Sequence, residues 1–171
     1  SLQGIEYAYK NNVSLIIALD CGIKAIEQID YANKKAIDFI ICDHHTPGDK
    51  IPHAIAVLNP KQIDCEYPYK ELSGCGVGFK LLQAYCMKND ISFNQIAEYL
   101  DLLTVSIGAD IVPMTGENRV LAFYGLKQIN STPSIGIKAL IDVSSKTKEL
   151  TMSDVVFGIA PRINAAGRID H

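Results

Sequence analysis

The chain has 171 residues, of which 48% are hydrophobic and 20% charged, a composition typical of globular rather than disordered proteins. The formal net charge of −3 argues against electrostatics as the main source of affinity for nucleic acid, although it does not exclude a local basic groove. No apolar run approaches the roughly 20 residues that span a bilayer, and no signal peptide is apparent. We therefore expect a cytoplasmic protein without membrane contact, whose five cysteines are reduced and mostly buried.

The N-terminal part of the chain alternates between helical and strand patterns. We predict a helix at 3–11, a strand at 13–19, a helix beginning near Ile23, and strands at 36–42 and 54–58. The continuous apolar run at 13–19 is typical of a strand covered on both faces. This order predicts a parallel sheet with right-handed crossovers. Because the chain opens on a helix, we expect that an earlier strand is missing.

Helical patterns dominate the rest of the chain. Ser73–Gly78 opens one helix, and Ser92 with Gln95 predicts a capping box for a single helix at 92–109. Further helices are predicted at 118–130, 135–143 and 153–159, the last with a capping box from Thr151 and Asp154 and an end at Pro161. The predicted fold class is α/β, with a sheet part over about residues 1–112 and a helical part over 113–171.

Acidic and imidazole side chains follow two of the predicted strands. Asp20 follows the first strand, and Asp43, His44 and His45 follow the second. Ligands of parallel sheets collect beyond the carboxyl ends of the strands, and two close carboxylates repel each other unless a cation or proton lies between them. The pattern favours a metal site. The alternatives are a structural loop at residues 43–45 and a helix N-cap role for Asp20.

Three later segments carry weaker signals. The glycine-rich turn at Ser73, Gly74 and Gly76 could present backbone N–H groups to a phosphate, or could serve close helix packing. Asp110 ends a predicted helix, where the negative macrodipole makes a carboxylate unfavourable unless a cation is near; it could also be an exposed loop residue. Arg162, Asn164 and Arg168 suit a phosphate-facing turn, but also a solvated surface loop.

Five motifs occur in the order found in one known family. These are Asp20-Cys21-Gly22, Asp43-His44-His45, Ser73–Gly78, Gly108–Pro113 and Pro161–Arg168. With them, the whole chain resembles the RecJ exonuclease family of the DHH phosphoesterase superfamily. The family's first motif, Asp-x-Asp-x-Asp-Gly, is absent, as are a DHHA1-type domain and an OB-fold. The chain is therefore expected to be an incomplete catalytic core, inactive or nearly so by itself.

The resemblance implies a role for each candidate residue. Asp20 would bridge two Mn²⁺ or Mg²⁺ ions, while His44 and Asp110 would complete the shell of one of them. His45 would face the scissile phosphate, and Asp43 would orient the histidines from behind. The remaining residues would line the substrate side, namely Ser73, Gly74, Gly76, Arg162, Asn164 and Arg168.

The implied reaction is 5′→3′ hydrolysis of single-stranded DNA to 5′ mononucleotides in DNA repair and recombination. Two divalent ions about 3.5–4 Å apart would supply a nucleophile and neutralise charge. The implied partners are single-stranded DNA, a helicase and a single-strand-binding protein. Two alternatives stay open: another DHH phosphodiesterase acting on short oligonucleotides, cyclic dinucleotides or pyrophosphate, and a non-catalytic scaffold of the same fold.

Overall fold

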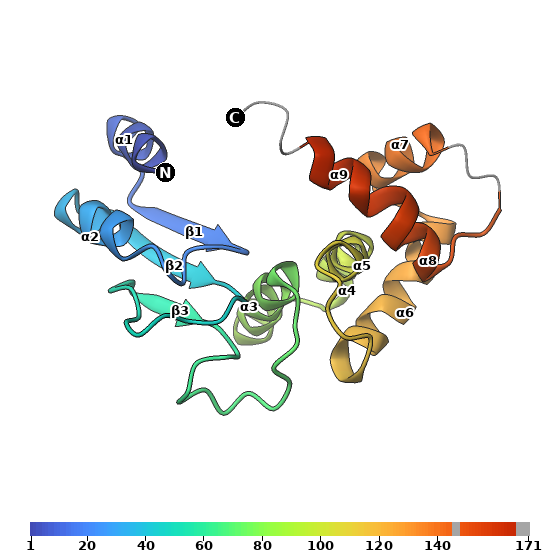
Figure 1. Cartoon of the computed structure of the whole chain (residues 1–171), viewed down its shortest axis with the longest axis horizontal. Helices are drawn as coiled ribbons and strands as arrows, with labels where there is room; N and C mark the ends of the chain where they lie inside the picture. Colours follow the sequence, from blue (N-terminus) through green and yellow to red (C-terminus); the bar gives the residue numbers. More distant parts are fainter. Residues whose placement is uncertain (145–147, 167–171) are drawn as a thin grey trace. The chain divides into compact units, whose positions relative to one another are not determined.

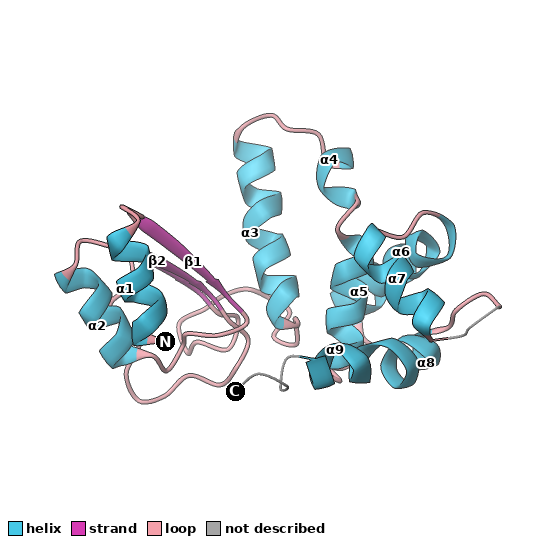
Figure 2. Cartoon of the chain, turned by 90° about the horizontal axis from the view of Figure 1, so that it is seen from above, coloured by secondary structure: helices cyan, strands magenta, loops and turns pink. Residues whose placement is uncertain are grey.

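The structure, a computed structural model, describes residues 1–144 and 148–166. The chain divides into two compact units, Ser1–Lys70 and Glu71–His171. The first unit contains a three-stranded parallel sheet and the second is helical (Figures 1 and 2), which confirms the α/β fold class.

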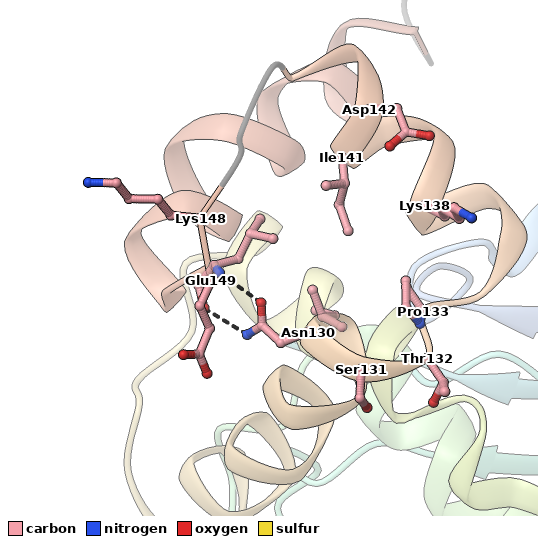
Figure 3. A pocket seen from close by; sticks show the side chains of 11 residues that line it. Asn130, Ser131, Thr132, Pro133, Lys138, Ile141, Asp142, Lys148 and Glu149 are labelled. Atoms are coloured by element: carbon pink, nitrogen blue, oxygen red, sulfur yellow. Dashed lines mark hydrogen bonds between the residues drawn. The ribbon is translucent and has the colours of Figure 1, made fainter.

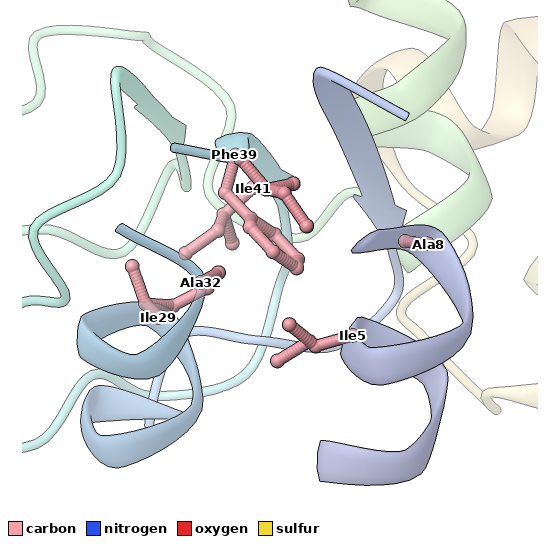
Figure 4. Close-up of a cluster of buried hydrophobic side chains, with 7 residues drawn as sticks. Ile5, Ala8, Ile29, Ala32, Phe39 and Ile41 are labelled. Carbon is pink, nitrogen blue, oxygen red and sulfur yellow. The ribbon is translucent and has the colours of Figure 1, made fainter. Parts of the chain in front are cut away.

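The first unit places two helices against a sheet of order β1-β2-β3. Its elements are α1 (Leu2–Lys10), β1 (Leu15–Leu19), α2 (Ile26–Lys34), β2 (Asp38–Cys42) and β3 (Ala56–Leu58). The α1 helix begins at Ser1, whose hydroxyl accepts a hydrogen bond from the N–H of Gly4. The core joins α1, α2 and β2 on one face of the sheet (Figure 4) and consists of Ile5, Ala8, Ile29, Ala32, Ile37, Phe39 and Ile41.

The prediction that the first strand is covered on both faces is wrong for the described residues. The side chains of Ile16 and Ala18 pack against the core, whereas Leu15, Ile17 and Leu19 are exposed. The reason is the position of β1 at the sheet edge, with both helices of the unit contributing to the core on the other face. An apolar run therefore predicted the strand correctly but not its burial.

The second unit is built around α5 and α6. Its elements are α3 (Gly74–Lys88), α4 (Asn94–Ala97), α5 (Leu100–Ala109), α6 (Gly116–Ser131), α7 (Ile135–Val143), α8 (Met152–Asp154), the π-helix η1 (Val155–Ile159) and α9 (Ala160–Ala166). One buried cluster joins α3, α4, α5 and α6, and a second joins α5, α6, α7 and η1. The structural division at residues 70 and 71 thus lies earlier than the boundary near 112 expected from the sequence, because α3 and α5 share a core with α6.

The predicted single helix at 92–109 is wrong, since α4 and α5 are separate. Ser92 accepts from the N–H of Asn94, and α4 has no side-chain cap. The α5 helix restarts with Asp101 in its first turn, where a carboxylate is favourable. Asp101 is fully buried and accepts a 2.7 Å hydrogen bond from the N–H of Ser134 before α7. This distant partner stabilises a helix start that the local pattern does not reveal.

The predicted capping box of Thr151 and Asp154 is confirmed at the start of α8. The predicted helix end at Pro161 is wrong, because the chain continues through η1 into α9. A proline inside a helix lacks an N–H donor and clashes with the carbonyl four residues earlier. The π-helix immediately before Pro161 widens the backbone there, a common way of accommodating such a defect.

Candidate metal centre

The parallel register of β1 and β2 aligns the two predicted acidic positions. Leu19 pairs with Cys42, so Asp20 and Asp43 directly follow paired residues at the carboxyl edge of the sheet. The N–H of Asp20 donates to the carbonyl of Cys42 at 2.8 Å, which extends the ladder to the site. The two strands are neighbours, which places the polar residues that follow them at one edge of the sheet.

Asp20 has a left-handed backbone conformation. Its φ is +62°, which is uncommon for a residue other than glycine and often occurs at functional sites. Gly22, two residues later, has a φ of +112°. Asp20 does not cap a helix: α2 begins at Ile26, and its N-cap position is Ala25. The N-cap alternative for Asp20 is therefore not realised.

Asp43 organises the loop that carries the two histidines. It is almost fully buried, and its carboxylate accepts hydrogen bonds from the N–H groups of Ile23 (2.9 Å), His44 (2.8 Å) and His45 (3.1 Å). Burial alone would raise the pKa of Asp43, but these hydrogen bonds and the one from the His45 ring together lower it below its ordinary value. Asp43 is thus a buried, ionised acceptor rather than an exposed ligand.

His45 is held in one orientation by this carboxylate. Its Nδ1 lies 2.7 Å from Oδ1 of Asp43. Because an ionised carboxylate only accepts hydrogen bonds, Nδ1 of His45 carries the proton in this contact. The backbone carbonyl of His45 accepts a 2.8 Å hydrogen bond from Asn59, which is itself buried and also accepts from the N–H of Lys61.

Asp20, His44 and His45 form the one group of metal-ligating side chains found among the described residues. Each offers a ligand atom, and these atoms all lie within 4.8 Å of one another. Nε2 of His44 is 3.2 Å from Oδ1 of Asp20. His44 is buried, while Asp20 and His45 are exposed, so the group is anchored on one side and accessible on the other. A pocket of about 410 Å³ adjoins it, lined by residues that include Asp20, Asp43 and His45.

The neighbouring cysteines do not add thiolate ligands. Cys42 is fully buried, and burial raises its pKa to about 11, so it remains a thiol at neutral pH. Burial and the carboxylates of Asp43 and Asp20 also raise the pKa of Cys21. All five cysteines are free, but only Cys42 and Cys86 are buried, so the expectation that the cysteines are mostly buried is wrong. The metal-ligating group itself contains only oxygen and nitrogen donors.

In the second unit, Asp110 and the glycine-rich turn lie together. Asp110 is the C-cap residue of α5, and its Oδ2 accepts from the hydroxyl of Ser106 at 3.3 Å and from the N–H of Gly74 at 3.4 Å. Gly74 is the first residue of α3, so the positive end of this helix offsets the unfavourable end of α5. The repulsion between the Asp110 carboxylate and the negative end of α5, which suggested a cation at this position, is thus already reduced by the protein.

The predicted phosphate turn has other hydrogen-bond partners in this structure. Ser73 is fully buried as the N-cap of α3, and its hydroxyl accepts from the N–H of Gly76 at 3.1 Å. A Cβ at Gly76 would lie 3.3 Å from this hydroxyl. Close packing and capping, the alternative considered from the sequence, therefore account for Ser73 and Gly76. Their contact with substrate stays a prediction.

Arg162 and Asn164 occupy a helix rather than the predicted turn. Both are exposed in α9, and Arg162 donates to the carbonyl of Gly158 one turn earlier. Asn164 lines a pocket of about 550 Å³ with residues of α5 and η1 that include Gly108 and Phe157. Arg168 lies outside the described residues. The helical conformation follows from η1, which carries the chain past Pro161.

A further pocket lies between the end of α6, α7 and residues 148–150 (Figure 3). It has a volume of about 710 Å³ and is lined by charges of both signs, including Lys138, Asp142 and Glu149. Asn130 exchanges two hydrogen bonds with the backbone of Leu150, at 2.9 and 2.7 Å, and so ties this segment to α6. Its mixed charge gives no ligand preference.

The structure thus brings together Asp20, Asp43, His44 and His45 in the first unit, and Asp110 with the Ser73–Gly76 turn in the second. Sequence reasoning missed two supporting groups, Asn59 and the N–H of Ile23. Asn59 follows the third strand directly, and this position was its only sequence signal.

Comparisons with known proteins show which family the chain is similar to. The model of the DHH family, N-terminal domain, matches residues 2–107. The chain belongs to the DHH family. Among curated relatives of this DHH chain, the single-stranded-DNA-specific exonuclease RecJ of Bacillus subtilis is 42% identical over 169 residues, covering 98% of the chain and 21% of the relative. RecJ of Escherichia coli is 36% identical over 181 residues, covering 99% and 31%.

Solved RecJ structures are similar to the DHH chain as well. RecJ from Thermus thermophilus in complex with Mn²⁺ matches with a TM-score of 0.84 and 30% identity, covering 99% of this chain and 25% of that chain. A second RecJ structure bound to manganese has a TM-score of 0.80 and 32% identity, covering 95% and 41%. The chain spans less than a third of the length of the two curated relatives named above.

Proposed function

We propose that this chain carries part of the catalytic centre of a metal-dependent exonuclease that hydrolyses single-stranded DNA from the 5′ end to 5′ mononucleotides. The observation that carries the proposal is the group of Asp20, His44 and His45, whose ligand atoms lie within 4.8 Å of one another at the carboxyl edge of the sheet. Support comes from the curated relatives, which are named as single-stranded-DNA-specific exonucleases.

The donor set fits a divalent cation. Asp20 and His44 offer one oxygen and one nitrogen ligand without thiolate, which suits Mn²⁺ and is compatible with Mg²⁺ when carboxylates and water complete the shell. The RecJ structures solved with Mn²⁺ support the same choice. When bound, a pair of such ions would lower the pKa of a water molecule and stabilise the attacking and leaving oxygens of the phosphodiester.

Each of the four residues at this edge of the sheet then has a proposed role. Asp20 and His44 would hold the metal. Asp43 fixes the loop through its hydrogen bonds to Ile23, His44 and His45. His45 is proposed to face the scissile phosphate, in keeping with its half-exposed ring and with its Nδ1 held by Asp43.

Further roles rest on the resemblance to RecJ. Asp110 is proposed as an additional ligand, and Gly74, Arg162 and Asn164 as substrate contacts. The proposed setting is the cytoplasm, in DNA repair and recombination, with a helicase and a single-strand-binding protein as partners. Within the part of the chain that the structure describes, no helix has the length and apolar character needed to cross a membrane.

Metal binding by the 171-residue chain tests the centre directly. Wild type should be stabilised by Mn²⁺ by about 2.7 kcal/mol at 100 times the dissociation constant, because the ion binds only the folded state. Asp20→Ala and His44→Ala should lose this stabilisation, whereas His45→Ala should retain most of it if His45 faces the phosphate. The matched control is His53→Ala, since His53 lies outside the metal-ligating group. A Mn²⁺ stabilisation of wild type that His44→Ala retains in full would exclude the site.

Hydrolysis is best tested in a chimera in which this chain replaces the aligned segment of Bacillus subtilis RecJ, 42% identical to it. With 5′-labelled single-stranded DNA and Mn²⁺, the chimera should release mononucleotides, and the His45→Ala chimera should bind the metal but cleave far more slowly. A product of dinucleotides or longer fragments would favour another DHH phosphodiesterase. DNA binding without cleavage would favour a scaffold. The expectation that the chain alone is inactive is checked in the same assay.

A further inference from the structure

The outer face of α6 combines aromatic and cationic side chains in an unusual way. Val120, Phe123, Tyr124 and Lys127 follow the i, i+3, i+4, i+7 spacing of one helical face, and all four are exposed. We call these four residues the α6 stripe. The opposite face of the helix carries Asn118, Ala122, Gly125 and Ile129, which are buried. The stripe is therefore not needed for the packing of α6 within its unit.

Two exposed aromatic rings at adjacent positions form the centre of the stripe. Phe123 is 54% exposed and Tyr124 is 56% exposed, and their ring centroids lie 5.2 Å apart at an interplanar angle of 82°. Exposing two large rings to water is costly for a surface without a partner. Because the rings are nearly perpendicular, they offer two separate flat faces rather than one continuous hydrophobic patch.

A cation is already placed over these rings. Nζ of Lys127 lies 4.3 Å from the ring centroid of Phe123 and 5.9 Å from that of Tyr124. Arg119 adds a second exposed cation on the flank of the stripe. The single carboxylate of α6, Glu117, is paired with Lys80 at 2.6 Å. The helix thus presents positive charge beside its aromatic rings, in a chain whose net charge is negative.

We propose that the α6 stripe is a contact surface for single-stranded DNA. Exposed rings stack on unpaired bases without regard to sequence, and adjacent lysine and arginine side chains attract the phosphates. This charge complementarity favours a nucleic-acid strand over an apolar protein partner, which would leave Lys127 and Arg119 unpaired. The proposal rests on the proposed function, since it assigns a further binding surface for the substrate.

Fluorescence anisotropy of labelled oligothymidylate with the 171-residue chain in EDTA tests the proposal. Phe123→Ala/Tyr124→Ala should weaken binding at least about fivefold, because base stacking on each ring is lost. Tyr85→Ala is the matched control, since Tyr85 is 58% exposed but lies on α3, outside the α6 stripe. An abasic oligonucleotide of equal charge should bind wild type and the double variant equally. Lys127→Gln should reduce the salt slope by about 0.7.

An affinity that stays within twofold of wild type in the double variant would overturn the proposal and leave a protein partner as the occupant of the stripe. The test separates this inference from the proposed function, because EDTA removes the cation required for cleavage. A chain whose DNA binding depends on the stripe, but whose chimera never cleaves DNA with Mn²⁺, would overturn the function and retain the surface. Circular dichroism of each variant shows whether the fold is intact.

Discussion

A single methyl group at Gly125 should disrupt the packing of α6 on α5. A Cβ at this position would lie 2.8 Å from the carbonyl carbon of Leu100, and closer still to the carbonyl oxygen of Leu100 and the hydroxyl of Thr104. The side chain of Thr104 already donates to that carbonyl at 2.8 Å, so both groups are fixed. Because part of the clash is with backbone, a change of rotamer cannot relieve it and the two helices must separate.

The expected cost lies at the upper end of the range for overpacked cores, about 3 kcal/mol. For a chain of this size, each kcal/mol shifts the melting temperature by roughly 2–4 °C, so Gly125→Ala should lower it by about 6–12 °C. Gly136→Ala is the matched control, because a Cβ at Gly136 in α7 meets nothing within 4 Å. Alanine has the higher helix propensity, so this variant should be neutral or stabilised by up to about 1 kcal/mol.

Thermal and urea unfolding followed by circular dichroism measures both variants. If Gly125→Ala and Gly136→Ala unfold at the same temperature, the close approach of α5 and α6 is not a feature of the protein in solution. Unfolding in two steps would be informative as well, since the chain divides into two units and only the second contains Gly125. In that case the lower melting temperature should appear only in the transition of the helical unit.

Three further substitutions test the site and its surroundings. Asp43→Asn should weaken Mn²⁺ affinity about 10–100-fold and lower the free energy of unfolding in urea by about 1–3 kcal/mol, because one amide cannot accept all the hydrogen bonds of the buried carboxylate. Wild-type Mn²⁺ affinity together with wild-type stability would contradict the role of Asp43 in holding the loop. Asn59→Ala should destabilise the chain by a similar amount, by removing the bond to the carbonyl of His45; an unchanged urea midpoint would refute this. Thr151→Ala should lower the free energy of unfolding by about 1 kcal/mol. Adding Asp154→Ala should lower it little further, because both residues belong to one capping box. Fully additive losses of stability would argue against the capping box.

Much of the first unit could be predicted because its signals are local. The apolar runs before Asp20 and Asp43 predicted two strands, and the parallel order of strands and helices predicted that their ends would meet. The residues that complete the centre act over longer distances. Asn59 reaches the histidine loop from beyond β3, and only the tertiary structure shows that its amide bonds the carbonyl of His45.

The errors in the second unit have the same physical origin. The break between α4 and α5 is stabilised by the buried carboxylate of Asp101 and its bond to Ser134, and by a 2.6 Å hydrogen bond from Gln128 to the carbonyl of Glu98. These partners are about thirty residues away along the chain, outside any helical window. Pro161 predicted a helix end on sound local grounds, but a π-helix resolved the conflict instead.

The geometry of the metal centre depends on the core through Gly22. A Cβ at this position would lie 3.3 Å from Cγ2 of Ile41, which is fully buried, and the φ of +112° would strain any side chain. Asp20 is therefore held in its own left-handed conformation between the ladder bond to Cys42 and a glycine that packs on the core. Asp43, by contrast, acts through hydrogen bonds to a loop. Core substitutions at Ile41 should thus alter metal affinity through Asp20, whereas changes at Asn59 should affect the phosphate-facing side chain of His45.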